Sequence, residues 1–176
     1  MKTSFETPRL LLRELQPYDD HGMFELDSDP EVHRYLGNQP VQSIEESRSH
    51  IDHICGQYIT NGIGRWAVIL KETNEFIGWA GLKLEKNVNG YDSFYDLGYR
   101  FIPKHWGKGY ATEAAKAWVD FGFNEMNLGI INAYTSLENK ASQNTLKKCG
   151  LRLVNTFIYD NEPELWYEIT RAEVIS

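Results

Sequence analysis

A short segment, Trp106 to Thr112, carries residue types that can bind an anion through the backbone. Gly107 and Gly109 are separated by one residue. Glycine lets a chain turn tightly and approach a ligand without an obstructing Cβ atom. We expect a helix to begin directly after Gly109, and the free amides and the dipole of a first helical turn favour negative charge. Lys108 adds a positive side chain. The segment therefore predicts a phosphate-binding loop.

Two common phosphate-binding motifs are excluded at this position. The phosphate loop of nucleoside triphosphatases needs a glycine five positions before its Gly-Lys pair, but Ile102 stands there. Gly109, rather than Ser or Thr, follows Lys108. The dinucleotide fingerprint fails because Thr112 occupies the position of its third glycine. For an isolated Gly-x-Gly, a turn that merely joins a strand to a helix is the alternative.

Basic residues gather in two parts of the chain. Residues 97–112 and 139–159 contain no acid and together hold seven of the 18 lysines and arginines, so all 25 acids lie elsewhere. The formal charge of the chain is −7, which argues against nucleic acid as a partner, since binding to a phosphate backbone requires a basic face. Two basic segments in an acidic chain favour a small polyanionic ligand. Chance clustering or a solvated face is the alternative.

The hydrophobic pattern predicts an α/β fold with a mixed sheet, because hairpins come first and strands alternate with helices later. Short helices are expected after Pro17 and after Asp29-Pro30. Ser43 and Glu46 form the S-x-x-E pattern of a capping box that begins a further helix. Strands are expected at about residues 10–12, 65–70, 76–84, 94–101, 130–135, 151–159 and 164–170.

Two later helices are the best specified. Asn139 can cap the second of them, which runs to about Cys149, and Gly150 supplies the left-handed residue that ends it. The first, directly after the expected phosphate loop, has a stripe of mostly small residues that allows close packing on a sheet: Ala111, Ala114, Ala115, Trp118 and Gly122.

Length and composition narrow the class of protein. The 176 residues are expected to form one domain, 1–176, because domains typically hold about 150 residues. No apolar run approaches the ~20 residues that cross a bilayer, and no apolar signal segment opens the chain, so no membrane partner is expected. Cys55 and Cys149 are far apart, which favours a reducing cytoplasm. His50 and His53 lack the spacing and third ligand of a metal site, so no metal is expected.

Three stretches match a known set of patterns. These patterns are T-x-R-L-x-L-R, G-Y-x-x-x-P-x-x-W-G-K-G-Y-A-T-E-A, and N-x-A-S followed by K-x-G-F. They are matched at Thr7, Arg9, Leu10, Leu12, Arg13, Gly98, Tyr99, Pro103, residues 106–114, Asn139, Ala141, Ser142, Lys148 and Gly150. On these residues the chain resembles the GNAT superfamily of acetyltransferases, and specifically its RimJ/RimL-like N-acetyltransferases. Trp106 stands where the wider superfamily has Gln or Arg, and Leu151 where this branch has Phe.

The resemblance implies acetyl-CoA as co-substrate and a sheet in which two neighbouring parallel strands splay apart to admit its pantetheine arm. Phe101 and Ile102 would line one side of that gap, and the strand leading to Asn139 the other. A backbone amide near Phe101 or Ile102 would stabilise the oxyanion of the reacting thioester. The residues implied in binding acetyl-CoA are Phe101, Ile102, Trp106, Gly107, Lys108, Gly109, Tyr110, Ala111, Thr112 and Asn139.

Family geometry also implies two catalytic side chains. Ser142 corresponds to a serine near the thioester sulfur that could protonate the departing thiolate, and capping of the helix is the alternative. Asp96 is the candidate base, because members of the superfamily often use an acid on this strand. For Asp96 the alternatives are an ion pair with Arg100 or simple exposure, and a chain of water molecules could replace a dedicated base.

We therefore expect an acetyl-CoA-dependent N-acetyltransferase in which a primary amine attacks the thioester directly in a ternary complex. The acceptor would be a protein N-terminal α-amine or a small-molecule amine such as an amino acid, a polyamine or an aminated antibiotic. A non-catalytic acyl-CoA-binding or regulatory module of the same fold is the second hypothesis. The sequence leaves the acceptor and the oligomeric state open.

Overall fold

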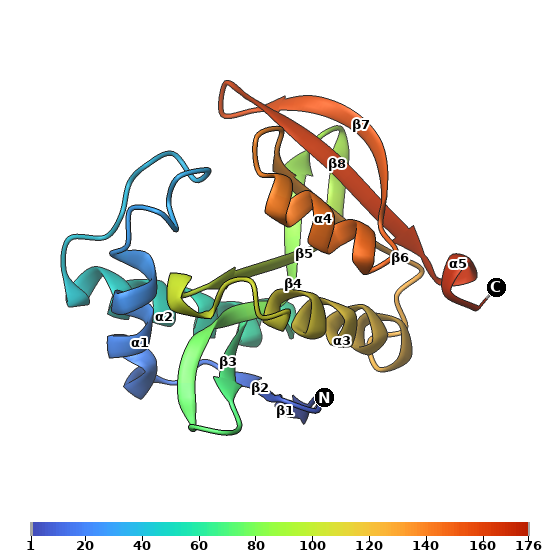
Figure 1. The fold of residues 1–176 in the computed structure, drawn as a ribbon. Helices are drawn as coiled ribbons and strands as arrows, with labels where there is room; N and C mark the ends of the chain where they lie inside the picture. The colour runs from blue at the N-terminus through green and yellow to red at the C-terminus, as the bar shows by residue number, and fades with distance from the viewer. Residues whose placement is uncertain (1, 176) are drawn as a thin grey trace.

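The computed structural model describes residues 2–175, which form a mixed β-sheet flanked by helices (Figure 1). The sheet has eight strands in the order β1-β2-β3-β4-β5-β6-β8-β7. Neighbouring strands run antiparallel except β5 and β6, which run parallel. The predicted α/β class with a mixed sheet is therefore confirmed. The strands are β1 (Ser4–Glu6), β2 (Leu10–Glu14), β3 (Trp66–Leu70), β4 (Glu75–Val88), β5 (Tyr91–Phe101), β6 (Ile130–Ser136), β7 (Arg152–Tyr159) and β8 (Glu162–Thr170).

The parallel pair β5 and β6 is the point at which the sheet opens. Asp96 of β5 and Asn132 of β6 are register partners, and no further register pair joins these two strands within residues 2–175. By contrast, β4 and β5 are paired along most of their length. Beyond Asp96 the two strands continue to Phe101 and Ser136, so unpaired backbone edges face each other there. The expected separation of two parallel strands is present.

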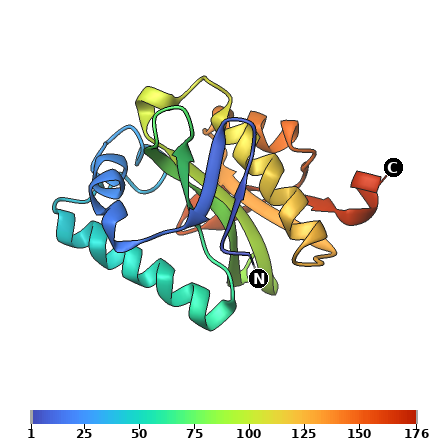
Figure 2. The ribbon, with the colours of Figure 1, turned by 90° about the horizontal axis from the view of Figure 1, so that it is seen from below.

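Helices lie on both faces of the sheet. Figure 2 shows α2 on one side of the strands and α3 on the other. The face covered by α1 and α2 is the front face, and the face covered by α3 and α4 is the back face. The helices are α1 (Asp20–Asp27), α2 (Ile44–Asn61), α3 (Tyr110–Asn124), α4 (Lys140–Lys148) and α5 (Arg171–Ile175), with single 3-10 turns at Pro17–Asp19 and Pro103–His105.

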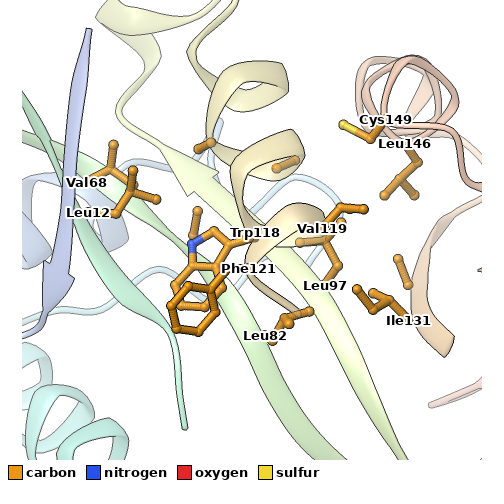
Figure 3. Close-up of a cluster of buried hydrophobic side chains, with 14 of the residues drawn as sticks. Leu12, Val68, Leu82, Leu97, Trp118, Val119, Phe121, Ile131, Leu146 and Cys149 are labelled. Atoms are coloured by element: carbon orange, nitrogen blue, oxygen red, sulfur yellow. The ribbon is translucent and has the colours of Figure 1, made fainter. Parts of the chain in front are cut away.

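The small-residue stripe of α3 packs on the back face as expected. Ala114, Ala115 and Trp118 are fully buried, and a Cβ atom on Gly122 would lie only 2.7 Å from Ile131 Cδ1. Figure 3 shows Trp118 and its neighbours on α3 directed into the cluster formed with the sheet. Burial of this stripe stabilises the fold at roughly 25 cal/mol per Å² of apolar surface.

The prediction of a helix after Asp29-Pro30 is wrong. Residues 30–37 form turns, and the bond from the Leu36 amide to the His33 carbonyl, 2.9 Å long, spans only three residues. The Asp29 side chain accepts from the Glu31 amide over 2.9 Å. Such local side-chain bonds compete with the backbone bonds of a helix, which explains the difference.

The strands around the β4–β5 turn are longer than expected. Their hairpin closes at Asn89-Gly90, where both residues have positive φ angles of 48° and 78°. Asn-Gly between two hydrophobic runs is a strong hairpin signal, because both residues tolerate the left-handed region. The extra strand β1 was also not expected, and it pairs with β2 at the sheet edge.

Candidate active site

The loop between β5 and α3 brings both glycines to the start of the helix. Gly107 and Gly109 have φ angles of 72° and 82°, in the left-handed region that glycine adopts without a Cβ penalty. Gly109 directly precedes α3, and no side chain caps the helix there. The bond from the Glu113 amide to the Gly109 carbonyl is 3.0 Å long. The three amides between these residues have no partner within the helix, so they can bind an anion.

The basic segment around this loop is mostly neutralised. Arg100 Nη1 lies 2.6 Å from Asp27 Oδ1 on α1, and Lys104 Nζ lies 2.6 Å from Glu75 Oε1 on β4. Both acids are distant in the sequence, so the local composition could not reveal them. Residues 97–112 therefore do not form one positive surface, and Lys108 is the basic residue within the loop itself.

One of the two expected oxyanion amides is already used by the sheet. The Ile102 amide donates to the Ile77 carbonyl of β4 over 3.0 Å. Successive residues of a strand direct their backbone groups to opposite edges, so the Phe101 amide faces the gap beside β6. Trp106 Nε1 donates to the Phe101 carbonyl over 2.7 Å, which fixes this end of the strand. Of the two backbone amides expected to stabilise the oxyanion, only that of Phe101 remains a candidate, because the Ile102 amide is hydrogen-bonded within the sheet.

Ser142 contacts a tyrosine that the sequence argument did not assign. The cap of α4 is Asn139, whose Oδ1 accepts from the Ser142 amide over 3.1 Å. Ser142 Oγ instead lies 3.1 Å from the hydroxyl of Tyr99, on the back face of β5. Burial raises the pKa of Tyr99, so its hydroxyl keeps its proton at neutral pH. The Tyr99 hydroxyl also donates to the Ser142 carbonyl over 3.1 Å, so Tyr99 contacts both the hydroxyl and the backbone of Ser142.

Asp96 is buried on the front face and pairs with Arg65. Arg65 Nη2 contacts Asp96 Oδ2, and Nη1 donates to the Asp96 carbonyl over 2.6 Å. Each of these two side chains is 9% exposed. Burial raises the pKa of Asp96, and the charge of Arg65 opposes that shift. The two alternatives weighed for Asp96, exposure and a pair with Arg100, are both wrong, because Arg100 binds Asp27.

Glycine makes room for the Arg65 guanidinium. A Cβ atom on Gly98 would lie 2.5 Å from Arg65 Nη2, and Arg65 Nη1 also contacts the carbonyl of Gly81. The Trp79 ring lies 5.5 Å from Arg65 Cζ. Gly98, one of the motif positions, thus lets Arg65 lie flat on the front face beside the point where β5 and β6 separate.

The front face beyond β6 carries aromatic rings and a perturbed carboxyl group. Trp166 stacks on Tyr91 at 4.9 Å between ring centroids, and Tyr134 lies 5.8 Å from Phe157. Burial, and to a smaller extent the charge of Glu162, raise the pKa of Glu164 to about 7. Burial also raises the pKa of Tyr134, with a further contribution from Asp96 across the strand separation.

Three residues with clear contacts at this site were given no role by the sequence analysis. Arg9 reaches the loop from the β1–β2 turn, Tyr99 contacts Ser142, and Arg65 pairs with Asp96. Arg9 and Tyr99 belong to the quoted motifs, so the motif positions were a usable signal. Arg65 carried none, because its partners lie 16 and 31 positions away.

The part of the chain that the structure describes has neither a group of metal-binding side chains nor a membrane-spanning helix. Among residues 2–175, no three or more His, Cys, Asp and Glu side chains gather where they could hold a metal ion. No helix in this part of the chain has the length and apolar character needed to cross a membrane. Cys55 and Cys149 are free thiols.

Comparison with known proteins agrees with this geometry. Residues 9–152 match the family model for an acetyltransferase (GNAT) domain. The chain belongs to the GNAT acetyltransferase family. Among its GNAT relatives, the uncharacterized N-acetyltransferase p20 of Bacillus licheniformis is 32% identical over 96% of this chain and 89% of its own length. A GNAT acetyltransferase structure from Bacillus anthracis has a TM-score of 0.79 and 31% identity, covering 95% of this chain and 98% of that one.

A further relative is named for its acetyl donor. An Aspergillus fumigatus protein named FsC-acetyl coenzyme A-N(2)-transacetylase is 32% identical over 97% of this chain and 77% of its own length. The GNAT family uses acetyl-CoA for N-acetylation. This GNAT protein is therefore an acetyltransferase, and its fold is the GNAT fold.

Proposed function

We propose that residues 1–176 form a single RimJ/RimL-like N-acetyltransferase domain that transfers an acetyl group from acetyl-CoA to a primary amine. The main structural support is the loop at residues 107–109, which presents three helix amides beside the separated strands β5 and β6. Two further features support a cytoplasmic enzyme: free cysteines, and the absence of an apolar spanning helix in residues 2–175.

The residues of the loop fit a diphosphate group. A Cβ atom on Gly107 would meet no atom within 4 Å, so the space beside this glycine is open. The helix amides supply donors and Lys108 supplies charge, which is the chemistry that a diphosphate needs. The proposed acetyl-CoA contacts are Phe101, Ile102, Trp106, Gly107, Lys108, Gly109, Tyr110, Ala111, Thr112 and Asn139.

In the proposed reaction the C–N bond to the amine forms and the C–S bond of the thioester breaks. The Phe101 amide stabilises the negative charge that develops on the thioester oxygen. Ser142 donates a proton to the departing sulfur and regains one from solvent. The Tyr99 hydroxyl, 3.1 Å away, orients the Ser142 hydroxyl for that step. Asp96, held by Arg65, accepts the proton of the amine directly or through water.

The proposed acceptor is a primary amine of a small molecule or of a protein N-terminus. A spermidine N-acetyltransferase from Vibrio cholerae, solved with CoA and spermine, has a TM-score of 0.75 at 20% identity, so it shares the fold. Aromatic rings and the Glu164 carboxyl on the front face suit an amine that carries positive charge elsewhere.

The experiment that tests this proposal is a thiol-release assay with acetyl-CoA and a panel of N-terminal peptides, amino acids, polyamines and aminated antibiotics. We expect steady CoA release with at least one class of amine. Asp96→Asn should lower that turnover and change its pH profile, whereas a purely structural Asp96 would leave the profile unchanged. Tight CoA binding without turnover on any amine would favour the non-catalytic acyl-CoA-binding module.

A further inference from the structure

The turn between β1 and β2 contacts the start of α3 through one carboxylate. Thr7 Oγ1 and the Arg9 amide donate to Glu113 Oε1 over 2.6 and 2.9 Å, and Arg9 Nε donates to Glu113 Oε2 over 2.6 Å. Glu113 lies in the first turn of α3, and its side chain is 15% exposed. One carboxylate in the first turn of α3, beside the loop at residues 107–109, thus receives three hydrogen bonds from a segment 104 or 106 positions earlier.

The Arg9 guanidinium also contacts the loop itself. Its Nη1 donates to the Lys108 carbonyl over 2.9 Å, and its Cζ lies 4.5 Å from the centroid of the Tyr110 ring. In a planar trans peptide the carbonyl and the following N–H point in opposite directions. Because Arg9 holds the Lys108 carbonyl, it directs the Gly109 amide away from itself.

The same contacts offset the repulsion that the Glu113 carboxylate would exert on a bound phosphate. A carboxylate in the first turn of α3 would repel a phosphate bound at that helix terminus. Burial raises the pKa of Glu113, and the hydrogen bonds from Thr7 and Arg9 outweigh it, so the pKa lies below its ordinary value. The carboxylate is therefore ionised and matched by the charge of Arg9, which leaves the helix amides free for a ligand.

We propose that Thr7, Arg9 and Glu113 are positioning residues that hold the loop at residues 107–109 ready to bind the diphosphate of CoA. These three residues form the loop clamp. Two glycines make the loop flexible, so an unrestrained loop would lose conformational entropy on binding. The loop clamp reduces that loss and acts on cofactor affinity rather than on acetyl transfer. This inference rests on the proposed function, because it assumes that the loop binds CoA.

The test is calorimetric titration of purified variants with CoA. Arg9→Lys keeps the charge but loses the planar fork of donors, and we expect it to raise the CoA dissociation constant about tenfold. Thr7→Val removes the hydrogen bond to Glu113 and the 3.0 Å bond that Thr7 Oγ1 accepts from the Leu10 amide, and it should raise that constant about threefold. Thr7→Ser keeps the hydroxyl and should restore the affinity. The matched control is Arg48→Lys, which alters a 2.8 Å ion pair with Asp20 elsewhere and should change CoA affinity less than twofold.

A kinetic measurement distinguishes positioning from general damage. With the amine that turns over fastest in the panel, Arg9→Lys should raise the KM for acetyl-CoA and leave kcat nearly unchanged. A fall in kcat that matches the change in KM would overturn the inference, and so would equal CoA affinity in Thr7→Ser and Thr7→Val.

Gly109→Val separates the inference from the proposed function. If this variant weakens CoA binding but Arg9→Lys does not, the loop binds CoA without the loop clamp and only the inference is wrong. If neither variant weakens CoA binding while both stay folded, the loop is not the cofactor site. The proposed function then loses its main structural support.

Discussion

At the scale of single residues, variants of Ser142 and Asn139 distinguish a catalytic role from a helix-capping role on α4. Ser142→Ala should lower turnover about 10²-fold with little change in CoA affinity, because it removes the proposed proton donor for the departing thiolate. Asn139→Ala should lower the free energy of unfolding by about 1 kcal/mol, since Asn139 caps α4, an effect separate from its proposed contact with acetyl-CoA. Thiol-release kinetics and urea unfolding measure the two effects. Normal turnover in Ser142→Ala would assign its hydroxyl a structural role.

Glu164 gives a residue-scale prediction about pH. Its pKa is raised from the ordinary 4.5 to about 7 by burial, so the folded state binds its proton more tightly than the unfolded state does. The stability from this group is present below about pH 4.5 and is lost as pH rises through about 7. Relative to Glu164→Gln, the wild-type Tm should therefore fall between these pH values. A Tm difference that is constant over this range would contradict the raised pKa.

At the scale of elements, Gly98 of β5 leaves the room that the Arg65 guanidinium occupies beside Asp96. Gly98→Ala would place a Cβ atom 2.5 Å from Arg65 Nη2 and displace it from Asp96. Breaking a buried ion pair costs about 3 kcal/mol, which urea unfolding can measure. Gly56→Ala on α2 is the matched control, because nothing lies within 4 Å of its Cβ position and alanine favours a helix. Equal stability of Gly98→Ala and the wild type would show that Arg65 can move freely.

At the scale of the whole molecule, the formal charge of −7 is expected to favour cationic acceptors. Pairing of Arg100 and Lys104 with acids removes much of the positive field that residues 97–112 would otherwise supply. As salt rises from roughly 0.01 to 0.15 M, the Debye length shrinks from about 30 to 8 Å, so kcat/KM should fall for cationic amines. Neutral acceptors serve as the control. An equal salt response for both would show that the acidic charge does not steer the acceptor.

Local pattern was sufficient for most elements. The Ala114 and Ala115 stripe, the Asn139 cap and the Ser43 cap are all signals within a few residues, and the structure contains each of them. The shape of the loop at Gly107 and Gly109 was predictable for the same reason, since it depends on two glycines separated by one residue and on a helix start. The turns at residues 30–37 were not, because the Asp29 side chain competes locally with the helix that Pro30 would have begun.

By itself, the sequence determined the class of fold, the loop at Gly107 and Gly109, and the resemblance to acetyltransferases. Only the tertiary structure decided which charges are neutralised and which amides are free. It brings Arg9 to Glu113 and Arg65 to Asp96 over long separations along the chain. The physical reason is that a backbone turn depends on neighbouring residues, whereas an ion pair depends on which distant elements the packing of the sheet places side by side.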